Sequence, residues 1–349
     1  MVLRERLSDI REVIHMTIRE ELEKMERETL SPYATLSVNT KGRERGEEQC
    51  DVRPVFQRDR DRILHCKAFR RLKNKTQVFL TPKGDHYRTR LSHTLEVSQN
   101  ARTIAKALRL NEDLVEAIAL GHDMGHTPFG HAGEYVLNEI CEDGFRHNEQ
   151  SVRIVEKLEK NGMGLNLTWE VRDGILNHQS KSMPHTLEGK VVRLSDKIAY
   201  VYHDVDDAIR AEILTEDDIP SEIRKTLGFT TKQRLNTLIH NVIMNSMDQD
   251  DIRMSADIQE AMFELRHFMF DHVYTNPIAK GEEVKAKAMI RQLFGFYKDH
   301  IEFLPEKYLA MLDEGEKTER VICDYIAGMT DQYAITKFQE FFVPAAWRY

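Results

Sequence analysis

The 349-residue sequence predicts an all-α fold. Along most of the chain, apolar residues recur at intervals of three and four, the spacing that gathers them on one face of a helix. No run alternates cleanly between apolar and polar side chains, so the pattern of a half-buried strand is missing. Hydrophobic residues make up 41% of the chain, an ordinary share for a globular protein, and we find no internal repeat or low-complexity tract.

The N-terminal part predicts one amphipathic helix followed by an irregular connection. Over residues 3–29, acids and bases occupy the outer positions, while the apolar positions keep helical spacing: Leu3, Leu7, Ile10, Ile14, Ile18, Leu22 and Met25. We interpret this helix as one that packs on the main body or on a neighbouring subunit. Residues 31–54 are polar and contain Pro32, Gly42 and Gly46, which favours an irregular connection.

Helical patterns continue beyond Pro54. The stretch 58–64 is helical in pattern, and Pro82-Lys83-Gly84-Asp85 predicts a turn. A helix predicted over 112–120 is preceded by Asn111, a residue type that caps free backbone N–H groups, and its first turn is acidic, as suits the positive helix end. The other helices are predicted over residues 91–109, 147–160, 168–177, 187–214, 220–248, 251–273, 282–299 and 316–328.

Composition excludes several classes of protein. A net charge of −8 argues against a general nucleic-acid binder, because duplex binding depends on an excess of Lys and Arg. No apolar run approaches the roughly 20 residues that cross a bilayer. The N-terminus becomes charged at once, unlike a signal peptide. The four cysteines are far apart and form no Cys-x-x-Cys pair, so we expect a reduced, cytoplasmic protein without disulfides.

Residues 121–134 stand out because they hold three histidines, two acids and four glycines. A helix that only had to end would need one glycine or one proline. The additional glycines indicate special backbone angles and close backbone approach. Imidazole and carboxylate groups within such an irregular backbone predict a metal and phosphate site.

Four positions on successive predicted helices form one candidate metal site. His93 lies near the start of the 91–109 helix, the His122-Asp123 pair closes the next helix, and Asp196 lies on a later one. Adjacent helical residues point about 100° apart, so this pair can share an ion only near a helix end. Two imidazoles and two carboxylates suit Mn²⁺, Fe²⁺, Co²⁺, Ni²⁺ or Zn²⁺, and Mg²⁺ less obviously.

The ordered pattern His, His-Asp, Asp resembles that of the HD-domain metal-dependent phosphohydrolases. More specifically, the chain resembles the deoxynucleoside triphosphate (dNTP) triphosphohydrolases of the dGTPase-like branch. Besides residues 121–134, the stretches that carry this resemblance are Phe56–Ile63, Phe69–Leu72, Lys75–Phe79, Arg88–Val97, Leu194–Tyr200 and Asp324–Asp331. The resemblance covers nearly the whole chain and is most convincing over residues 31–210.

The resemblance implies an all-α HD-domain core with additional N- and C-terminal helices. We place an N-terminal helix and connection in residues 1–50, the HD core in 51–215, and a C-terminal helical region packed on the core in 216–349. The implied reaction is metal-dependent hydrolysis of a dNTP to a deoxynucleoside and tripolyphosphate, by attack of water at the α-phosphorus. The implied partners are the dNTP substrate, a nucleotide effector and further copies of the chain in a homo-oligomer.

The resemblance also implies catalytic roles near the metal. His131 and Glu134 stand at positions i and i+3 of one helix face; His131 is expected close to the scissile phosphate, with Glu134 orienting its imidazole. His126 is a second catalytic candidate that contacts phosphate. For both histidines the alternative role is support of the metal ligands. His147 resembles a further active-site histidine, with a surface histidine at a helix start as the alternative.

Substrate contacts are implied along the helix that carries Asp196. Tyr200 and Asp204 follow Asp196 at intervals of four and share its face. By resemblance Tyr200 packs on the sugar and Asp204 accepts the 3′-OH together with Gln77, while Lys197 and Arg90 contact phosphates. We expect the remaining polar positions of this helix to form an outward stripe: Tyr202, His203, Asp206 and Asp207.

Two alternative functions remain open on the sequence alone. The same metal site could act on another nucleotide, namely a nucleoside monophosphate, a cyclic nucleotide or an alarmone. The chain could also be a non-catalytic, nucleotide-sensing oligomer. The stretch Asp324–Asp331 carries no metal spacing and no nucleophile, so we interpret it as core packing or a subunit contact.

Overall fold

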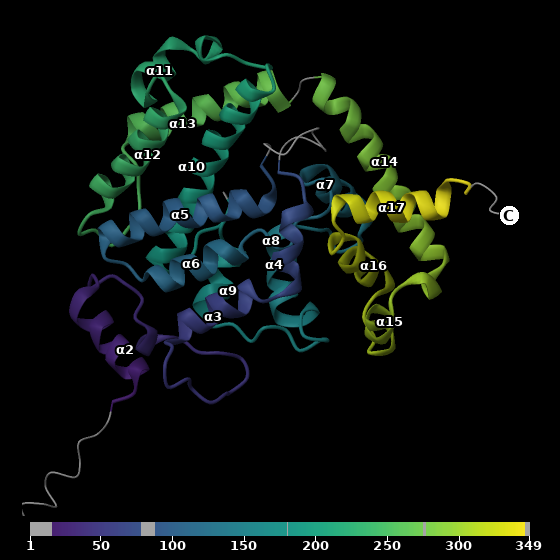
Figure 1. Ribbon diagram of the computed structural model, residues 1–349, viewed down its shortest axis with the longest axis horizontal. Coiled ribbons are helices and arrows are strands. Elements are labelled where there is room, and N and C mark those ends of the chain that lie inside the picture. Colours follow the sequence, from purple (N-terminus) through teal and green to yellow (C-terminus); the bar gives the residue numbers. More distant parts are fainter. Residues whose placement is uncertain (1–15, 78–87, 180, 275–276, 346–349) are drawn as a thin grey trace, which may run out of the picture.

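The computed structural model describes residues 16–77, 88–179, 181–274 and 277–345 (Figure 1). Within these ranges the chain forms helices and no strand, and the only β-type pairings are two isolated bridges, Arg43 with Thr168 and Thr76 with Thr89. The all-α prediction is therefore confirmed. None of the described helices combines the length and apolar character needed to cross a membrane.

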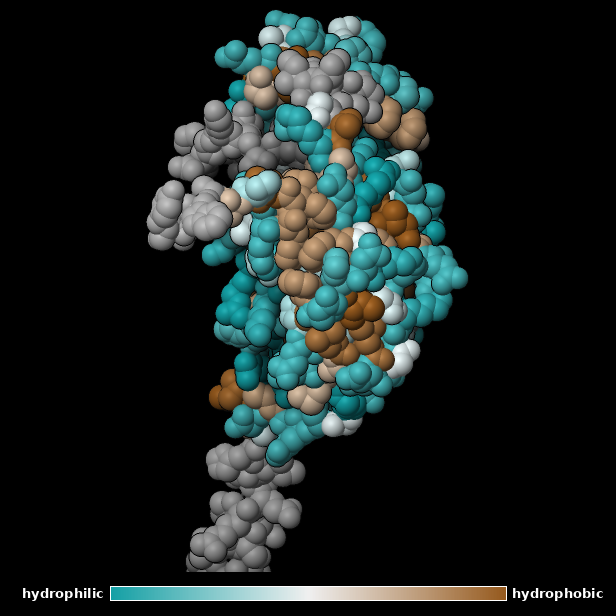
Figure 2. All heavy atoms as spheres, turned by 90° about the vertical axis from the view of Figure 1, so that its right-hand side faces the viewer, coloured by the Kyte–Doolittle hydropathy of each residue, from teal (hydrophilic) through white to brown (hydrophobic). Residues whose placement is uncertain are grey.

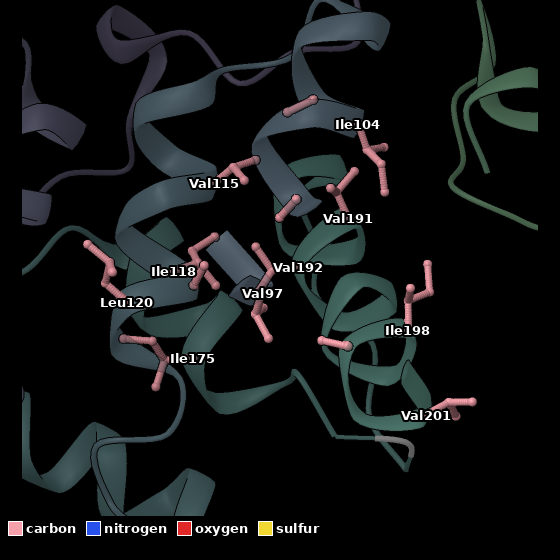
Figure 3. Close-up of a cluster of buried hydrophobic side chains, with 14 of the residues drawn as sticks. Val97, Ile104, Val115, Ile118, Leu120, Ile175, Val191, Val192, Ile198 and Val201 are labelled. Carbon is pink, nitrogen blue, oxygen red and sulfur yellow. The ribbon is translucent and has the colours of Figure 1, made fainter. Parts of the chain in front are cut away.

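The first hydrophobic core is built around α5 (Arg90–Leu108), α6 (Glu112–Gly121) and α10 (Leu187–Arg210), which pack against one another. Branched aliphatic side chains from these helices and from α9 (Trp169–Leu176) interlock (Figure 3). The same core takes in α3 (Val55–Leu64), α4 (Lys67–Arg71), α11 (Ser221–Leu227), α12 (Thr231–Ser246) and α13 (Ala256–Met269).

Side-chain caps fix where the central helices begin. Thr89 and Ser92 form a reciprocal capping box at the start of α5, which places His93 in the first turn of that helix. Asn111 accepts the Leu114 N–H at 3.2 Å and so caps α6, as predicted. These caps supply partners for helix N–H groups that would otherwise be unpaired inside the protein.

A second hydrophobic core joins α7 (His131–Ile140) to the C-terminal helices. Figure 1 shows α7 beside α14 (Pro277–Asp299), with α15 (Glu306–Asp313), α16 (Thr318–Ala327) and α17 (Asp331–Phe342) completing this part of the molecule. Phe129, Val136 and Leu137 pack in this core. The helix that carries His131 and Glu134 therefore belongs to a different core from the helices that carry the proposed metal ligands.

Several predicted helix boundaries differ from the structure. The helix predicted over 220–248 is wrong as one element, because Gly228 at φ +125° separates α11 from α12. The helix predicted over 147–160 ends earlier: α8 (His147–Arg153) passes into a π-helical turn, Ile154–Leu158. At the N-terminus, α2 runs Ile18–Thr29, whereas the predicted residues 3–15 lie outside the described ranges. The predicted turn at 82–85 also lies outside them.

The face formed by the C-terminal helices carries hydrophobic patches within a largely hydrophilic surface (Figure 2). Large apolar side chains exposed in this part of the chain include Phe303, Phe342 and Val343. Contiguous apolar surface of this kind is typical of protein contacts. The prediction of a homo-oligomer and the division into residues 1–50, 51–215 and 216–349 stay predictions.

Candidate active site

The structure brings the four predicted metal ligands together at the meeting point of α5, α6 and α10. The Nε2 atoms of His93 and His122 lie 3.2 Å and 3.7 Å from Oδ1 of Asp196. Oδ1 of Asp123 lies 3.5 Å from His122 Nε2. Nitrogen and oxygen ligands of one divalent ion stand roughly 3 Å apart when each lies about 2.0–2.2 Å from it. His93, His122 and Asp123 therefore have the spacing of a metal-binding group, and Asp196 lies close to both histidines of that group.

The state of His122 shows that this cluster favours a cation. Its Nδ1 donates to the Ala119 carbonyl at 2.7 Å, which leaves Nε2 as the nitrogen that can bind either a proton or a metal ion. Among the described residues this buried Nε2 has no hydrogen-bond partner. Burial opposes a charge on His122, but Asp123 and Asp196 raise its pKa to about 9. Positive charge is stabilised where a divalent ion would bind.

The buried His203, paired with Glu96, supports His93 from behind. Nδ1 of His93 lies 3.2 Å from Nδ1 of His203, and His203 pairs in turn with Glu96. The prediction that His203 and Asp207 belong to an outward stripe is wrong, because their side chains are buried. The spacing of residues along the helix could not predict that this face is buried, because α10 packs against other helices on several sides.

Replacing His203 with phenylalanine tests this support. The variant keeps a ring of similar shape but removes the group facing His93 Nδ1, so the orientation of His93 is no longer fixed. Partners of this kind typically change metal affinity by about 10–100-fold, and we expect a loss in that range. Isothermal titration with Mn²⁺ measures it. The exposed His267, replaced by alanine, serves as the control; equal affinity in both variants contradicts the assignment.

A second cluster adjoins the metal ligands and contains His126, His131, Glu134 and His147, whose ligand atoms lie within 4.8 Å of one another. Glu134 faces His131 Nδ1 at 3.0 Å and His147 Nδ1 at 2.9 Å. Burial acts to raise the pKa of Glu134, but His147, His131 and His126 outweigh it and lower that pKa. Glu134 is thus an ionised carboxylate that orients two imidazoles.

The histidines of this cluster differ in how far they are exposed to solvent. The His131 side chain is 68% exposed, whereas His126 is buried, stacks on His147 with ring centroids 3.8 Å apart, and lies 3.2 Å from Asp123 Oδ1. His147 begins α8 but is also buried, so the surface alternative for it is wrong. Gly125 makes this approach feasible, because a Cβ there would lie 2.2 Å from the His147 carbonyl oxygen.

His178 belongs to the site although we did not predict it from the sequence. Its Nε2 lies 3.2 Å from His147 Nε2, and Asp123, His147 and His178 form a further group with metal-ligand spacing. Its Nδ1 faces the Ile175 carbonyl at 2.7 Å, as His122 faces Ala119. The signal was present: like His122, His178 comes directly after a predicted helix.

The site opens into a cavity of about 1290 Å³. His131, Glu134, His147, Asp196, Lys197 and Tyr200 line one part of it, and α13 supplies another wall that includes Phe263 and Arg266. Arg266 lies over the Tyr200 ring, 5.9 Å from its centroid. Burial, with help from Arg193 and Arg266, lowers the pKa of Lys197 to about 8. We did not predict Arg266 from the sequence, because no spacing links it to the earlier residues.

Three predicted substrate residues lie behind this cavity rather than in its lining. Arg90 is buried and its Nη1 donates to Asp123 Oδ2 at 2.8 Å. Asp204 is buried, and burial raises its pKa well above the usual range, with Asp207 adding to the effect. The Oε1 atom of Gln77 is buried and has no hydrogen-bond partner among the described residues.

Sequence comparison matches residues 90–201 to the HD domain and residues 252–340 to the phosphohydrolase-associated domain. With the helical core and its His/Asp cluster, this defines the chain as a hydrolase of the HD-domain class. A deoxyguanosinetriphosphate triphosphohydrolase-like protein of Caldanaerobacter subterraneus subsp. tengcongensis is 56% identical over 332 residues, 95% of this chain and 98% of that protein. The chain belongs to the family of deoxyguanosinetriphosphate triphosphohydrolase-like proteins.

Other relatives agree with this assignment. A protein of the same description from Clostridium perfringens strain 13 is 50% identical over 338 residues, covering 94% of this chain and 98% of its own. The crystal structure of a phosphohydrolase from Bacteroides thetaiotaomicron VPI-5482 covers 81% of this chain and 68% of its own, at 18% identity and a TM-score of 0.50. That likeness concerns the fold.

Proposed function

We propose that this protein hydrolyses a deoxynucleoside triphosphate to the deoxynucleoside and tripolyphosphate. The observation that carries the proposal is the contact between two clusters. Asp123, a proposed metal ligand, lies 3.2 Å from His126, which stacks on the Glu134-bound His147 beside a cavity large enough for a nucleotide. The dGTPase-like description of the close relatives supports a nucleotide triphosphate as the substrate.

His93, His122, Asp123 and Asp196 would hold the divalent ion, for which the candidates are Mn²⁺, Mg²⁺, Co²⁺, Ni²⁺, Fe²⁺ and Zn²⁺. The ion would supply Lewis acidity toward a phosphoryl oxygen and toward water. Arg90 neutralises part of the Asp123 charge through its 2.8 Å contact, which orients that carboxylate. The two aspartates supply negative charge that would stabilise a divalent cation, and the same cation could also bind phosphate oxygens.

His131 would move the proton in this reaction. Glu134 accepts from its Nδ1 and stabilises the protonated ring, so the exposed imidazole can donate a proton to the leaving 5′-oxygen of the deoxynucleoside or take one from the attacking water. His126 is buried against Asp123 and can donate to a phosphate oxygen. His147, held by Glu134, fixes the position of the His126 ring by stacking.

The sugar and the remaining phosphates would be held along α10 and α13. Tyr200 presents a ring to the cavity, and Lys197 on α10 and Arg266 on α13 offer positive charge to it. Burial raises the pKa of Asp204, which favours the protonated carboxyl group, and such a group can both donate to and accept from a 3′-OH. Gln77 has a buried oxygen that needs a donor. Leaving such buried groups unpaired costs about 1–3 kcal/mol each, which favours a substrate that carries this hydroxyl.

Product analysis tests the proposal. Each of the four dNTPs, alone and mixed, is incubated with the protein and several divalent metals, with the four ribonucleotides in parallel. We expect deoxynucleoside and tripolyphosphate in equal amounts, with little turnover of ribonucleotides. The mixed samples reveal activation by a nucleotide effector. Orthophosphate or pyrophosphate as the product from every dNTP contradicts the proposal. Tight dNTP binding without turnover favours the sensing alternative, and the oligomeric state is measured by light scattering.

A further inference from the structure

A carboxylate from the C-terminal helices reaches the turn that leads to His131. Asp331 is the first residue of α17 and is only 5% exposed. Its Oδ1 accepts the Phe129 N–H at 2.9 Å. Its Oδ2 accepts the Thr76 N–H at 2.8 Å and also the Thr76 hydroxyl. One buried side chain thus binds two backbone segments that are far apart in the sequence.

Each bound segment leads directly to a residue of the proposed site. Phe129 and Gly130 have φ angles of +62° and +55°, and His131 follows them. A left-handed conformation at a phenylalanine is unfavourable unless surrounding contacts hold it. On the other side, Thr76 immediately precedes Gln77. The positions of His131 and Gln77 therefore depend on the two segments that Asp331 holds.

The two segments also touch each other. A Cβ on Gly130 would lie 3.6 Å from the Gln77 carbonyl oxygen and 3.7 Å from that of Thr76. It would also lie 2.9 Å from Nη2 of Arg90, the residue that binds Asp123. The turn therefore fits closely between the Thr76–Gln77 backbone and Arg90. A small displacement of Phe129 would therefore also displace Thr76, Gln77 and Arg90.

Lys75 makes a second link of the same kind. Its ammonium group is buried and donates to the carbonyl oxygens of His126 and, at 2.8 Å, of Ala327 at the end of α16. The carbonyl at the start of the turn and the N–H near its end are thus both linked to the C-terminal helices. These contacts do more than the core packing or subunit contact expected for Asp324–Asp331.

We propose that Asp331 is a positioning residue for the reaction. It holds the 126–131 turn and the Thr76–Gln77 segment in register, so that His131 and Gln77 face one substrate together. The C-terminal helices thereby complete the active site without touching the substrate. The catalytic consequence rests on the proposed function, whereas the restraint on the two segments does not.

Asp331→Asn tests the proposal, because the amide keeps the size of the carboxylate but turns an N–H₂ group toward one set of donors. Displacements of about 1 Å near a reacting centre lower rates by about 100-fold. We expect kcat to fall by about 10–100-fold, with bound metal unchanged in elemental analysis. Hydrogen exchange should accelerate in peptides that contain Phe129 and Thr76. Thr76→Val removes only the hydroxyl donor and should give a smaller loss in the same direction.

Asp324→Asn is the matched control. Asp324 is also a buried carboxylate, on α16, but it binds Arg153 and Gln150 of α8, and within the described ranges no hydrogen bond joins it to Phe129 or Thr76. If both aspartate variants lose the same kcat, or if Asp331→Asn leaves kcat and exchange at Phe129 unchanged, the proposal is overturned. Should Asp331→Asn fail to fold, Thr76→Val decides by the same two measurements. If the wild-type protein hydrolyses no dNTP, hydrogen exchange still tests the restraint.

Discussion

The variant His122→Ala is expected to lose both bound metal and hydrolytic activity. His122 turns its Nε2 toward the cluster, where it has no hydrogen-bond partner among the described residues, while its Nδ1 is committed to Ala119. His93 approaches the cluster from α5 and Asp196 from α10, so the loss of His122 opens the side of the cluster that the end of α6 supplies. Without the ion, neither water nor the phosphoryl group is activated. We expect kcat/KM to fall by about 1000-fold or more.

Elemental analysis and kinetics on the same preparation separate the two losses. Wild-type protein stripped by a chelator should reproduce the variant's rate, and added Mn²⁺ should restore the wild type but not His122→Ala. His267→Ala, at an exposed position on α13, should match the wild type in both measurements. Full metal content in His122→Ala would remove this residue from the proposed ligand set.

The variant His131→Ala is expected to keep the metal and lose turnover. His131 is exposed to the cavity and is held by Glu134, and it does not belong to the group formed by His93, His122 and Asp123. Positioned acid–base groups contribute about 100–10,000-fold, so kcat should fall within that range. Because the phosphates are also held by other groups, KM should change less than kcat.

Glu134→Gln provides the comparison for His131→Ala. The amide keeps the shape but cannot stabilise a protonated His131, so its rate should lie between those of the wild type and His131→Ala. Combining the two changes should lower the rate little beyond His131→Ala alone, because both act on one proton transfer. Additive losses in the double variant would show that Glu134 acts independently, for example through His147.

The sequence predicted the helical fold and the set of residues that converge because both depend on local patterns. Helical spacing identified the central helices, and the order His, His-Asp, Asp identified the four groups that the structure brings together. Contacts from distant segments were not predictable in this way. His178 joins the cluster from the end of α9, and Arg266 reaches the cavity from α13. Which helices meet is decided by packing, and no spacing within one helix contains that information.

The buried polar residues show the same limit. An acid at position 207 or a histidine at 203 is typical of a solvated helix face, yet both side chains are buried by neighbouring elements. Asp331 belongs to a stretch that we interpreted from the sequence as core packing or a subunit contact, whereas its carboxylate binds Thr76 and Phe129. A buried polar group is stable only when it has hydrogen-bond partners. The partners of Asp331 lie more than 200 residues away in the sequence.

The placement of α7 in the second core has a consequence for loss of function under stress. The metal-binding cluster is embedded in the first core, whereas the helix carrying His131 is anchored by Phe129, Val136 and Leu137 in the second. Units of this kind can open separately, at different free energies. Loosening of the second core alone would leave a metalloprotein that keeps its ion and most of its helix content but turns over no substrate. Retained metal is therefore no measure of an intact enzyme.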